Sequence, residues 1–125
     1  MSRLTAYLHP KCSTCERARR WLQQRGVDFV EKDIRATPPS TAELRTMLAA
    51  LGGKRGKLFN TSGLEYRGQG LAAKLPGLDD AAALSLLAGN GMLVKRPFVL
   101  GPGVALVGFN EAAWAAALAG TGRKG

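Results

Sequence analysis

The sequence is poor in the residues that build metal sites and disulfide frameworks. It holds two cysteines and one histidine among 125 residues. Two cysteines cannot form a disulfide framework, and with His9 they supply three of the four ligands that a structural zinc site needs. We therefore expect no metal site, and a redox or nucleophilic role suits the cysteines better than a structural one.

Long hydrophobic runs are absent as well. The longest apolar stretches lie near residues 81–88 and 112–119, far short of the ~20 residues that a membrane-spanning helix needs. The first twelve residues lack the apolar run of a signal peptide. We expect a cytoplasmic protein with no membrane partner. In that reducing compartment a lone Cys-x-x-Cys pair is usually functional.

Acidic residues are few relative to basic ones. Lys and Arg number 18 against 9 Asp and Glu, so that the net charge is +9. Such a charge suits an anionic ligand or nucleic acid. However, the charges are scattered from Arg3 to Lys124, and few aromatic residues lie among them. We interpret the charge as a basic soluble surface and expect no nucleic-acid partner.

The first 34 residues show a strand–helix–strand pattern. Residues 3–8 alternate polar and apolar side chains, which is typical of a strand. Apolar residues then recur at helical spacing from Ser13 or Thr14, either of which can cap a helix, until Gly26. Residues 27–34 are predicted to form a second strand. Two strands joined by a helix are parallel, with a right-handed crossover.

The rest of the chain predicts a helical block, a hairpin and a last helix. The block covers residues 40–91, with Ser40 or Thr41 opening its first helix and Glu43 placed for a capping box if Ser40 is the cap. Short helical turns are expected over residues 54–78, which are rich in glycine. Apolar runs at 92–100 and 104–109, joined by a Gly-Pro-Gly turn, predict a hairpin. Asn110 is predicted to cap the last helix. The order predicts an α/β fold with a four-stranded mixed sheet. We expect one domain over residues 1–119 and a flexible tail at 120–125.

The candidate chemistry lies at Cys12, between the first strand and the first helix. Ligand chemistry in such sheets gathers at the carboxyl ends of strands, where helix amides point outward. A helix terminus stabilises a thiolate by at most ~2 kcal/mol, whereas lowering a pKa by two units takes about 2.7 kcal/mol. Lys11 and Arg17 add local positive charge. A specific cation or direct amide hydrogen bonds should supply the rest.

The two cysteines have unequal predicted roles. Cys15 lies one helical turn beyond Cys12, so its sulfur can resolve a mixed disulfide formed there. Periodicity places Cys15 on the more buried side of the helix. We predict that Cys12 attacks and that Cys15 resolves. The alternative is a pair of buried cysteines that act as small hydrophobic residues.

Arg96 and His9 each have a functional and a structural interpretation. Arg96, which with Pro97 opens the third strand, either contacts an oxyanion or the thiolate or is a solvated arginine. Only ~5–6% of X-Pro bonds are cis, so the pattern alone gives no support for a cis bond at Pro97. His9 is a candidate acid or base near Cys12, but the sequence identifies no partner for it, and a structural role is favoured.

These motifs resemble those of the arsenate-reductase-like family, which also includes the Spx regulators. The resemblance covers nearly the whole chain and rests on residues 7–15, 58–63 with 66–67, 93–98 and 107–110. It implies a thioredoxin-like sheet with a helical insertion between the second and third strands. It also implies a reactive Cys12, a functional Arg96 and a cis Pro97.

The function that this resemblance implies is thiol–disulfide oxidoreductase. Arg96 would stabilise an anionic substrate or the thiolate. No bound cofactor is expected, and glutathione or a dithiol protein, glutaredoxin or thioredoxin, would donate electrons. The alternative is an Spx-like redox-sensing transcriptional regulator whose partner is RNA polymerase. The residues expected to bind substrate are Lys11, Ser13, Thr14, Asn60 and Pro97.

The sequence departs from the glutaredoxin-linked arsenate reductases of this family, which hold the oxyanion with three arginines. Arg96 matches one of them, whereas Asn60 and Gly108 stand where the others fall. Glu16 replaces an arginine, and no histidine lies four residues before Cys12. Each charge-assisted contact contributes about 1.5–3 kcal/mol, so weaker oxyanion binding is predicted. The paired cysteines resemble the Spx-type redox pair.

Overall fold

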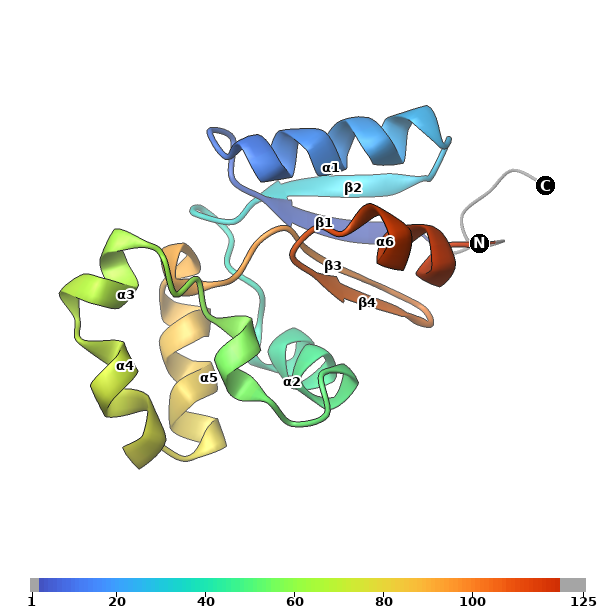
Figure 1. Ribbon diagram of the computed structural model, residues 1–125. Helices are drawn as coiled ribbons and strands as arrows, with labels where there is room; N and C mark the ends of the chain where they lie inside the picture. Colours follow the sequence, from blue (N-terminus) through green and yellow to red (C-terminus); the bar gives the residue numbers. More distant parts are fainter. Residues whose placement is uncertain (1–2, 120–125) are drawn as a thin grey trace. The chain divides into compact units, whose positions relative to one another are not determined.

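The structure is a computed structural model that describes residues 3–119 and divides them into two compact units (Figure 1). The sheet unit takes the described residues up to Asp33 and from Arg96 onward. The helical unit is Ile34–Lys95. That the chain folds as one domain stays a prediction. The predicted tail at 120–125 lies outside the described residues.

The sheet unit contains the four-stranded mixed sheet that the sequence predicted. Its strand order is β2-β1-β3-β4. The first two strands pair in parallel, and β3 runs antiparallel to both of its neighbours, with Tyr7 of β1 opposite Phe98. The strands are β1 (Leu4–Leu8), β2 (Phe29–Asp33), β3 (Phe98–Gly101) and β4 (Val104–Val107).

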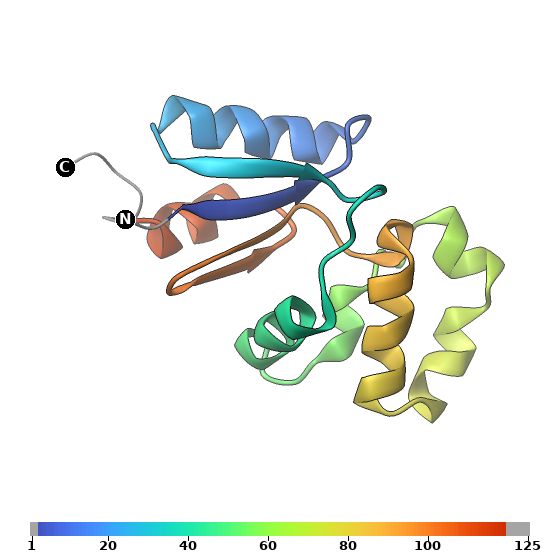
Figure 2. The ribbon, with the colours of Figure 1, turned by 180° about the vertical axis from the view of Figure 1, so that it is seen from behind.

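Helices α1 (Ser13–Gln24) and α6 (Glu111–Ala117) pack in one core with the sheet (Figures 1 and 2). Alternate residues of β1 point into this core, as the period of two requires. The rings of Trp21 and Trp114 meet edge to face with centroids 5.9 Å apart. Asn110 caps α6 as predicted, by accepting from the N–H of Ala113 at 2.9 Å.

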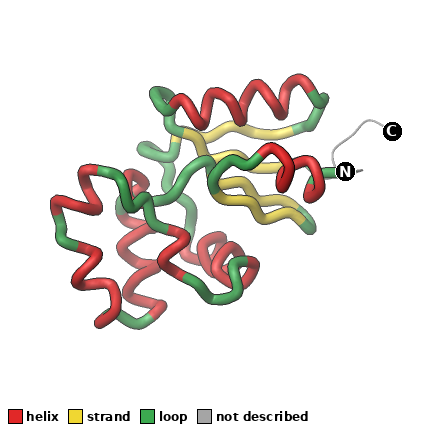
Figure 3. Tube along the Cα trace, viewed as in Figure 1, coloured by secondary structure: helices red, strands yellow, loops and turns green. Residues whose placement is uncertain are grey.

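The helical unit is built from helices joined by short turns, and residues 54–78 form the short helical turns that the sequence predicted (Figure 3). Ser40 and Glu43 form the expected capping box at the start of α2. Asp79 caps α5 by accepting from the N–H of Ala82 at 2.8 Å. The helices are α2 (Thr41–Ala50), α3 (Leu64–Gly68), α4 (Leu71–Lys74) and α5 (Asp80–Gly89), with 3-10 turns at Arg55–Leu58, Leu75–Gly77 and Gly91–Leu93.

Two expectations about element boundaries are wrong. Neither Ser13 nor Thr14 caps α1, because Cys12 occupies the N-cap. The apolar run at 92–100 contributes a strand only from Phe98. Its earlier backbone groups bond elsewhere: Leu93 accepts from Asn60 at 2.7 Å, and Lys95 donates to Leu58 at 2.7 Å. In addition, a proline at 97 has no N–H to give to a sheet ladder.

Candidate active site

Cys12 is both the candidate nucleophile and the N-cap residue of α1. Its backbone is extended, with φ −98° and ψ 122°, and its N–H donates to the carbonyl of His9 at 3.2 Å. Its Sγ accepts a hydrogen bond from the N–H of Cys15 at 3.4 Å. An N-cap side chain normally offers an oxygen to these amides. Here a half-buried sulfur takes that place, at the positive end of the helix dipole.

The surroundings of Cys12 favour its ionised form. Partial burial opposes ionisation, but the N–H and thiol of Cys15, the N–H of Thr14 and the charge of Arg96 outweigh it and lower the pKa of Cys12. Hydrogen bonds and a positive charge stabilise the charged state of a thiol. Since the thiolate is the nucleophile, this is the environment of a reactive cysteine.

Cys15 lies in the opposite kind of environment. Its side chain is fully buried, and its Sγ accepts from the backbone N–H of His9 at 3.4 Å. Burial, together with the neighbouring Cys12, raises the pKa of Cys15 to about 12, although the His9 N–H and the charge of Arg96 act the other way. The two sulfurs therefore differ: Cys12 ionises readily, whereas Cys15 remains a thiol that donates to it.

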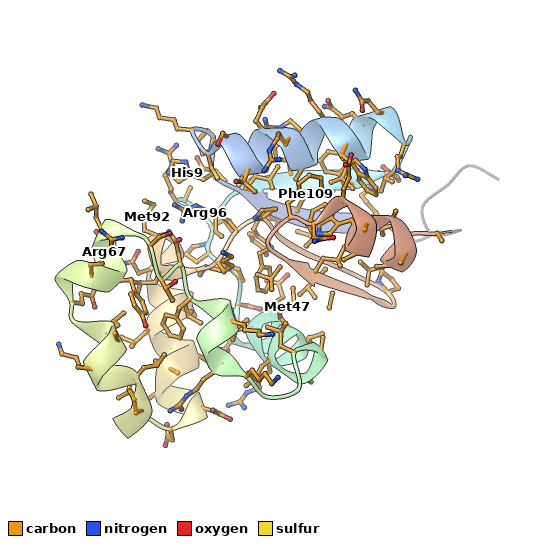
Figure 4. All side chains as sticks on the ribbon, in the orientation of Figure 1. His9, Met47, Arg67, Met92, Arg96 and Phe109 are labelled. Atoms are coloured by element: carbon orange, nitrogen blue, oxygen red, sulfur yellow. The ribbon has the colours of Figure 1, made fainter. Side chains whose placement is uncertain are left out.

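Arg96 and Pro97 come to this site through the pairing of β1 with β3. Tyr7 pairs with Phe98, so the residues just before β3 lie level with the loop that follows β1. Figure 4 shows His9 and Arg96 at the end of the sheet unit where α1 begins. Arg96 is half-buried and its charge acts on both cysteines, which favours contact with the site over full solvation. The Arg96–Pro97 bond is cis, as the resemblance implied.

The other residues expected to bind substrate fall into two groups. Lys11 and Ser13 are exposed beside Cys12, and Thr14 is half-buried there. Pro97 is buried, and its carbonyl accepts from the N–H of Gly108 at 2.9 Å. Asn60 belongs to the helical unit, where its side chain lies against Gly63: a Cβ built on that glycine would come within 2.6 Å of the amide nitrogen.

Gly108 and Glu16, which stand where the resemblance implies arginines, both have defined contacts. Gly108 has a φ of +72°, which disfavours any larger residue, and its carbonyl accepts from the indole N–H of Trp114 at 3.0 Å. Glu16 forms ion pairs with Arg19 and Arg20 on its own helix. Arg17 lies over the ring of Phe109, 5.8 Å from the centroid.

Sequence reasoning missed the contacts of His9, for which it found no partner. Its N–H reaches Cys15, its carbonyl accepts from Cys12, and its Nδ1 accepts from the N–H of Lys11 at 3.0 Å. The available signal was Pro10, which after a strand favours the second position of a turn.

Within residues 3–119, no three His, Cys, Asp or Glu side chains gather as a metal site. None of the helices described is long and apolar enough to cross a membrane.

Comparison with known proteins gives consistent matches over most of the chain. A model of the ArsC family matches residues 7–117. An uncharacterized protein of Bacillus subtilis (strain 168), YusI, is 42% identical over 86% of this chain and 92% of its own length. The global transcriptional regulator Spx of Streptococcus pyogenes serotype M6 is 31% identical, over 86% of this chain and 79% of its own.

A solved structure extends the comparison to three dimensions. The crystal structure of a possible arsenate reductase from Streptococcus mutans UA159 superposes with a TM-score of 0.80 at 42% identity. The superposition covers 86% of this chain and 91% of that one. The thioredoxin-like arrangement of sheet and helices is thus shared with a solved relative.

Proposed function

The chain belongs to the ArsC family, and from the unequal environments of its two cysteines we propose that it is a thiol–disulfide oxidoreductase. Cys12 is the nucleophile and Cys15 the resolving thiol. The observation that carries this proposal is the sulfur of Cys12 at the N-cap of α1, where it accepts from the N–H of Cys15. A cysteine used only for packing has no need of such a position.

The proposed reaction proceeds in three steps. The Cys12 thiolate attacks one sulfur of a disulfide substrate, forms a mixed disulfide and expels the other sulfur as a thiolate, which takes a proton from solvent. Cys15 then loses its proton and attacks the Cys12 sulfur, which releases the second substrate thiol and leaves a Cys12–Cys15 disulfide. Two external thiols then reduce the Cys12–Cys15 disulfide and are themselves oxidised to a disulfide.

Arg96 has two tasks in this scheme. Its charge favours the Cys12 thiolate before attack, and it stabilises an anionic substrate or the departing thiolate afterwards. Lys11, Ser13 and Thr14 bind the substrate beside Cys12, while Pro97 shapes the same surface. Asn60, which belongs to the helical unit, stays a prediction from the sequence.

Glutathione or a dithiol protein of the glutaredoxin or thioredoxin type supplies the electrons, in a cytoplasmic setting where such donors are kept reduced. Arsenate is one candidate substrate, supported by the likeness to a possible arsenate reductase. We expect weak arsenate binding, because Gly108 stands where the family pattern has an arginine and has no side chain to supply a positive charge. Its positive φ also disfavours a larger residue there. A disulfide substrate does not need those cations.

Alkylation of the thiols against pH tests the proposal. Wild-type protein, Cys12→Ser and the matched control Cys15→Ser are treated with iodoacetamide between pH 5.5 and 9, and labelled peptides are measured by mass spectrometry. Cys12 should label faster than free glutathione at pH 6 in wild type and in Cys15→Ser. Labelling at the rate of a model thiol would sink the proposal. A second assay identifies the substrate and the electron donor. It follows NADPH oxidation coupled through the glutathione, glutaredoxin or thioredoxin system, with a small disulfide or with arsenate as the substrate.

A second candidate function is an Spx-like regulator in which the Cys12–Cys15 disulfide is a switch and RNA polymerase is the partner. The Spx relative, 31% identical over 86% of this chain, favours it. Binding of the reduced and the oxidised protein to purified bacterial RNA polymerase would test this function. Affinity that depends on the redox state supports the regulator, whereas no binding in either state removes it.

A further inference from the structure

His9 joins the end of β1 to the start of α1, and three of its polar groups engage that connection. Its backbone N–H donates to Cys15 Sγ at 3.4 Å. Its carbonyl accepts from the N–H of Cys12 at 3.2 Å. Its Nδ1 accepts from the N–H of Lys11 at 3.0 Å. One residue therefore contacts the main chain of the candidate nucleophile and the sulfur of its partner.

The side chain of His9 plays the part that asparagine or aspartate usually plays in a turn. The bond from Cys12 to His9 closes a four-residue turn, with Pro10 in the position that proline favours. Asparagine at the first position of such a turn accepts from the N–H two residues on. Nδ1 lies one bond beyond Cγ, as the Oδ1 of asparagine does. To accept, Nδ1 must be unprotonated, so the imidazole carries its proton on Nε2.

We propose that His9 is a positioning residue for the cysteine pair: its imidazole holds the turn at Lys11, and the turn holds the His9 peptide groups against Cys12 and Cys15. The consequence for catalysis rests on the proposed oxidoreductase function, but the positioning itself does not. Without the Nδ1 acceptor, the Lys11 N–H turns to water and the His9 peptide units gain freedom to rotate. Both sulfurs then lose part of their fixed environment.

This role differs from that of a general acid or base. An acid–base residue must exchange a proton with the reacting sulfur, whereas a positioning residue needs only an acceptor at the right place. The two roles make opposite predictions for asparagine at position 9, which offers the acceptor but cannot titrate. Glutamine is the matched control, because its acceptor lies one bond farther out.

The experiment compares wild type with His9→Ala, His9→Asn and His9→Gln by two readouts. The first is the rate of Cys12 alkylation by iodoacetamide against pH. The second is the hydrogen exchange of the Lys11 amide, measured by NMR. We expect His9→Ala to slow Cys12 alkylation at pH 6.5, and to speed exchange at Lys11, by about two- to tenfold, the usual worth of one hydrogen bond. His9→Asn should restore both readouts to within about twofold of wild type, and His9→Gln should behave like His9→Ala.

Three results would overturn the inference. His9→Ala could match wild type in both readouts, His9→Asn could be as impaired as His9→Ala, or His9→Gln could rescue as well as His9→Asn. Failure of the proposed function gives a different result: wild-type Cys12 would then react no faster than glutathione. In that case exchange at Lys11 across the same variants still decides whether His9 holds the turn.

Discussion

The core of the sheet unit differs from that of the helical unit in its aromatic content. The core of the sheet unit contains Trp21 and Trp114, and both rings also contact Phe109 edge to face. The buried hydrophobic residues of the helical unit are almost all aliphatic. They are Ile34, Leu44, Met47, Leu48, Leu58, Phe59, Leu71, Leu75, Ala83, Leu84, Leu87, Leu93 and Val94.

The aromatic contacts of the sheet unit fix the backbone beside the candidate active site. Aromatic rings have specific preferred contacts, and an indole N–H seeks an acceptor. Trp114 meets both demands, because its Nε1 donates to the carbonyl of Gly108 while its ring packs on Trp21. Gly108 in turn bonds to Pro97, the residue after Arg96. The helical unit relies instead on local caps and on aliphatic packing, which tolerates small shifts.

The sharpest test of this comparison is removal of the nucleophile. Cys12→Ser should lower disulfide reductase activity by about 10³-fold or more, because a serine hydroxyl is not ionised at neutral pH. Leu84→Ala, a cavity in the helical unit, should leave kcat within about twofold where the protein is folded. Steady-state kinetics at 15 °C, with circular dichroism as the folding control, measures both. A large fall in kcat for Leu84→Ala would mean that the chemistry is not confined to the sheet unit.

Core truncation gives the next largest effect. Trp114→Ala should lower the free energy of unfolding by about 3–5 kcal/mol, since it removes a buried ring. Trp114→Phe keeps most of the packing and loses the bond to Gly108, and should cost ~1 kcal/mol or somewhat more. Urea unfolding measures both variants. We also expect Trp114→Phe to slow Cys12 alkylation, and an unchanged rate would show that the Trp114–Gly108–Pro97 chain does not reach the site.

The pH dependence of stability separates the two cysteines. A thiol in the unfolded chain ionises near its ordinary value of 9.0, whereas burial raises the pKa of Cys15 to about 12. Between these values the unfolded chain has lost a proton that the folded chain keeps, so the free energy of unfolding falls as pH rises from about 9 to about 12.

Cys12 has the opposite sign. Its pKa is lowered, so its contribution to stability is present above pH 9.0 and is lost as pH falls through the folded pKa.

Because the alkaline loss of stability comes from Cys15, the free energy of unfolding of Cys15→Ser should fall less steeply above pH 9 than that of wild type. Urea unfolding of both proteins across this pH range measures the difference. Parallel curves for the two proteins would contradict the burial of an un-ionised Cys15.

The smallest predicted effect belongs to a local cap of the helical unit. Ser40→Ala removes the acceptor for the N–H of Glu43, at 3.1 Å, and should cost ~1 kcal/mol of stability. Because the Ser40 hydroxyl caps α2 through Glu43, within the helical unit, Cys12 alkylation should keep its wild-type pH profile. Ser40→Thr retains a hydroxyl and is the control. A shifted pH profile in Ser40→Ala would remove the contrast between the two units.

Features with local causes could be predicted from the sequence. The alternation of residues 3–8, the capping box at Ser40 and the cap at Asn110 each depend on neighbours within a few positions, and all three are present. The order of elements then suffices for the sheet, because a strand–helix–strand unit and a hairpin have few ways to join.

Features with distant causes could not be predicted. Ser13 and Thr14 are better caps than cysteine by preference, yet the turn at His9 places the cap at Cys12. The residues before Phe98 resemble a strand, but their bonding partners at Leu58 and Asn60 lie more than thirty positions earlier. The cis bond at Pro97 follows no local pattern and was indicated by the family resemblance alone.

The cap at Cys12 makes helix α1 a reporter of what happens to its sulfur. Any group that becomes attached to Cys12 Sγ competes with the hydrogen bond from the Cys15 N–H, which is the side-chain cap of that helix. Loss of a cap costs about 0.5–2 kcal/mol, enough to move a melting temperature by several degrees in a domain of this size. Covalent inhibitors and mixed disulfides could thus be ranked by thermal shift alone, with no chromophore and no coupled enzyme.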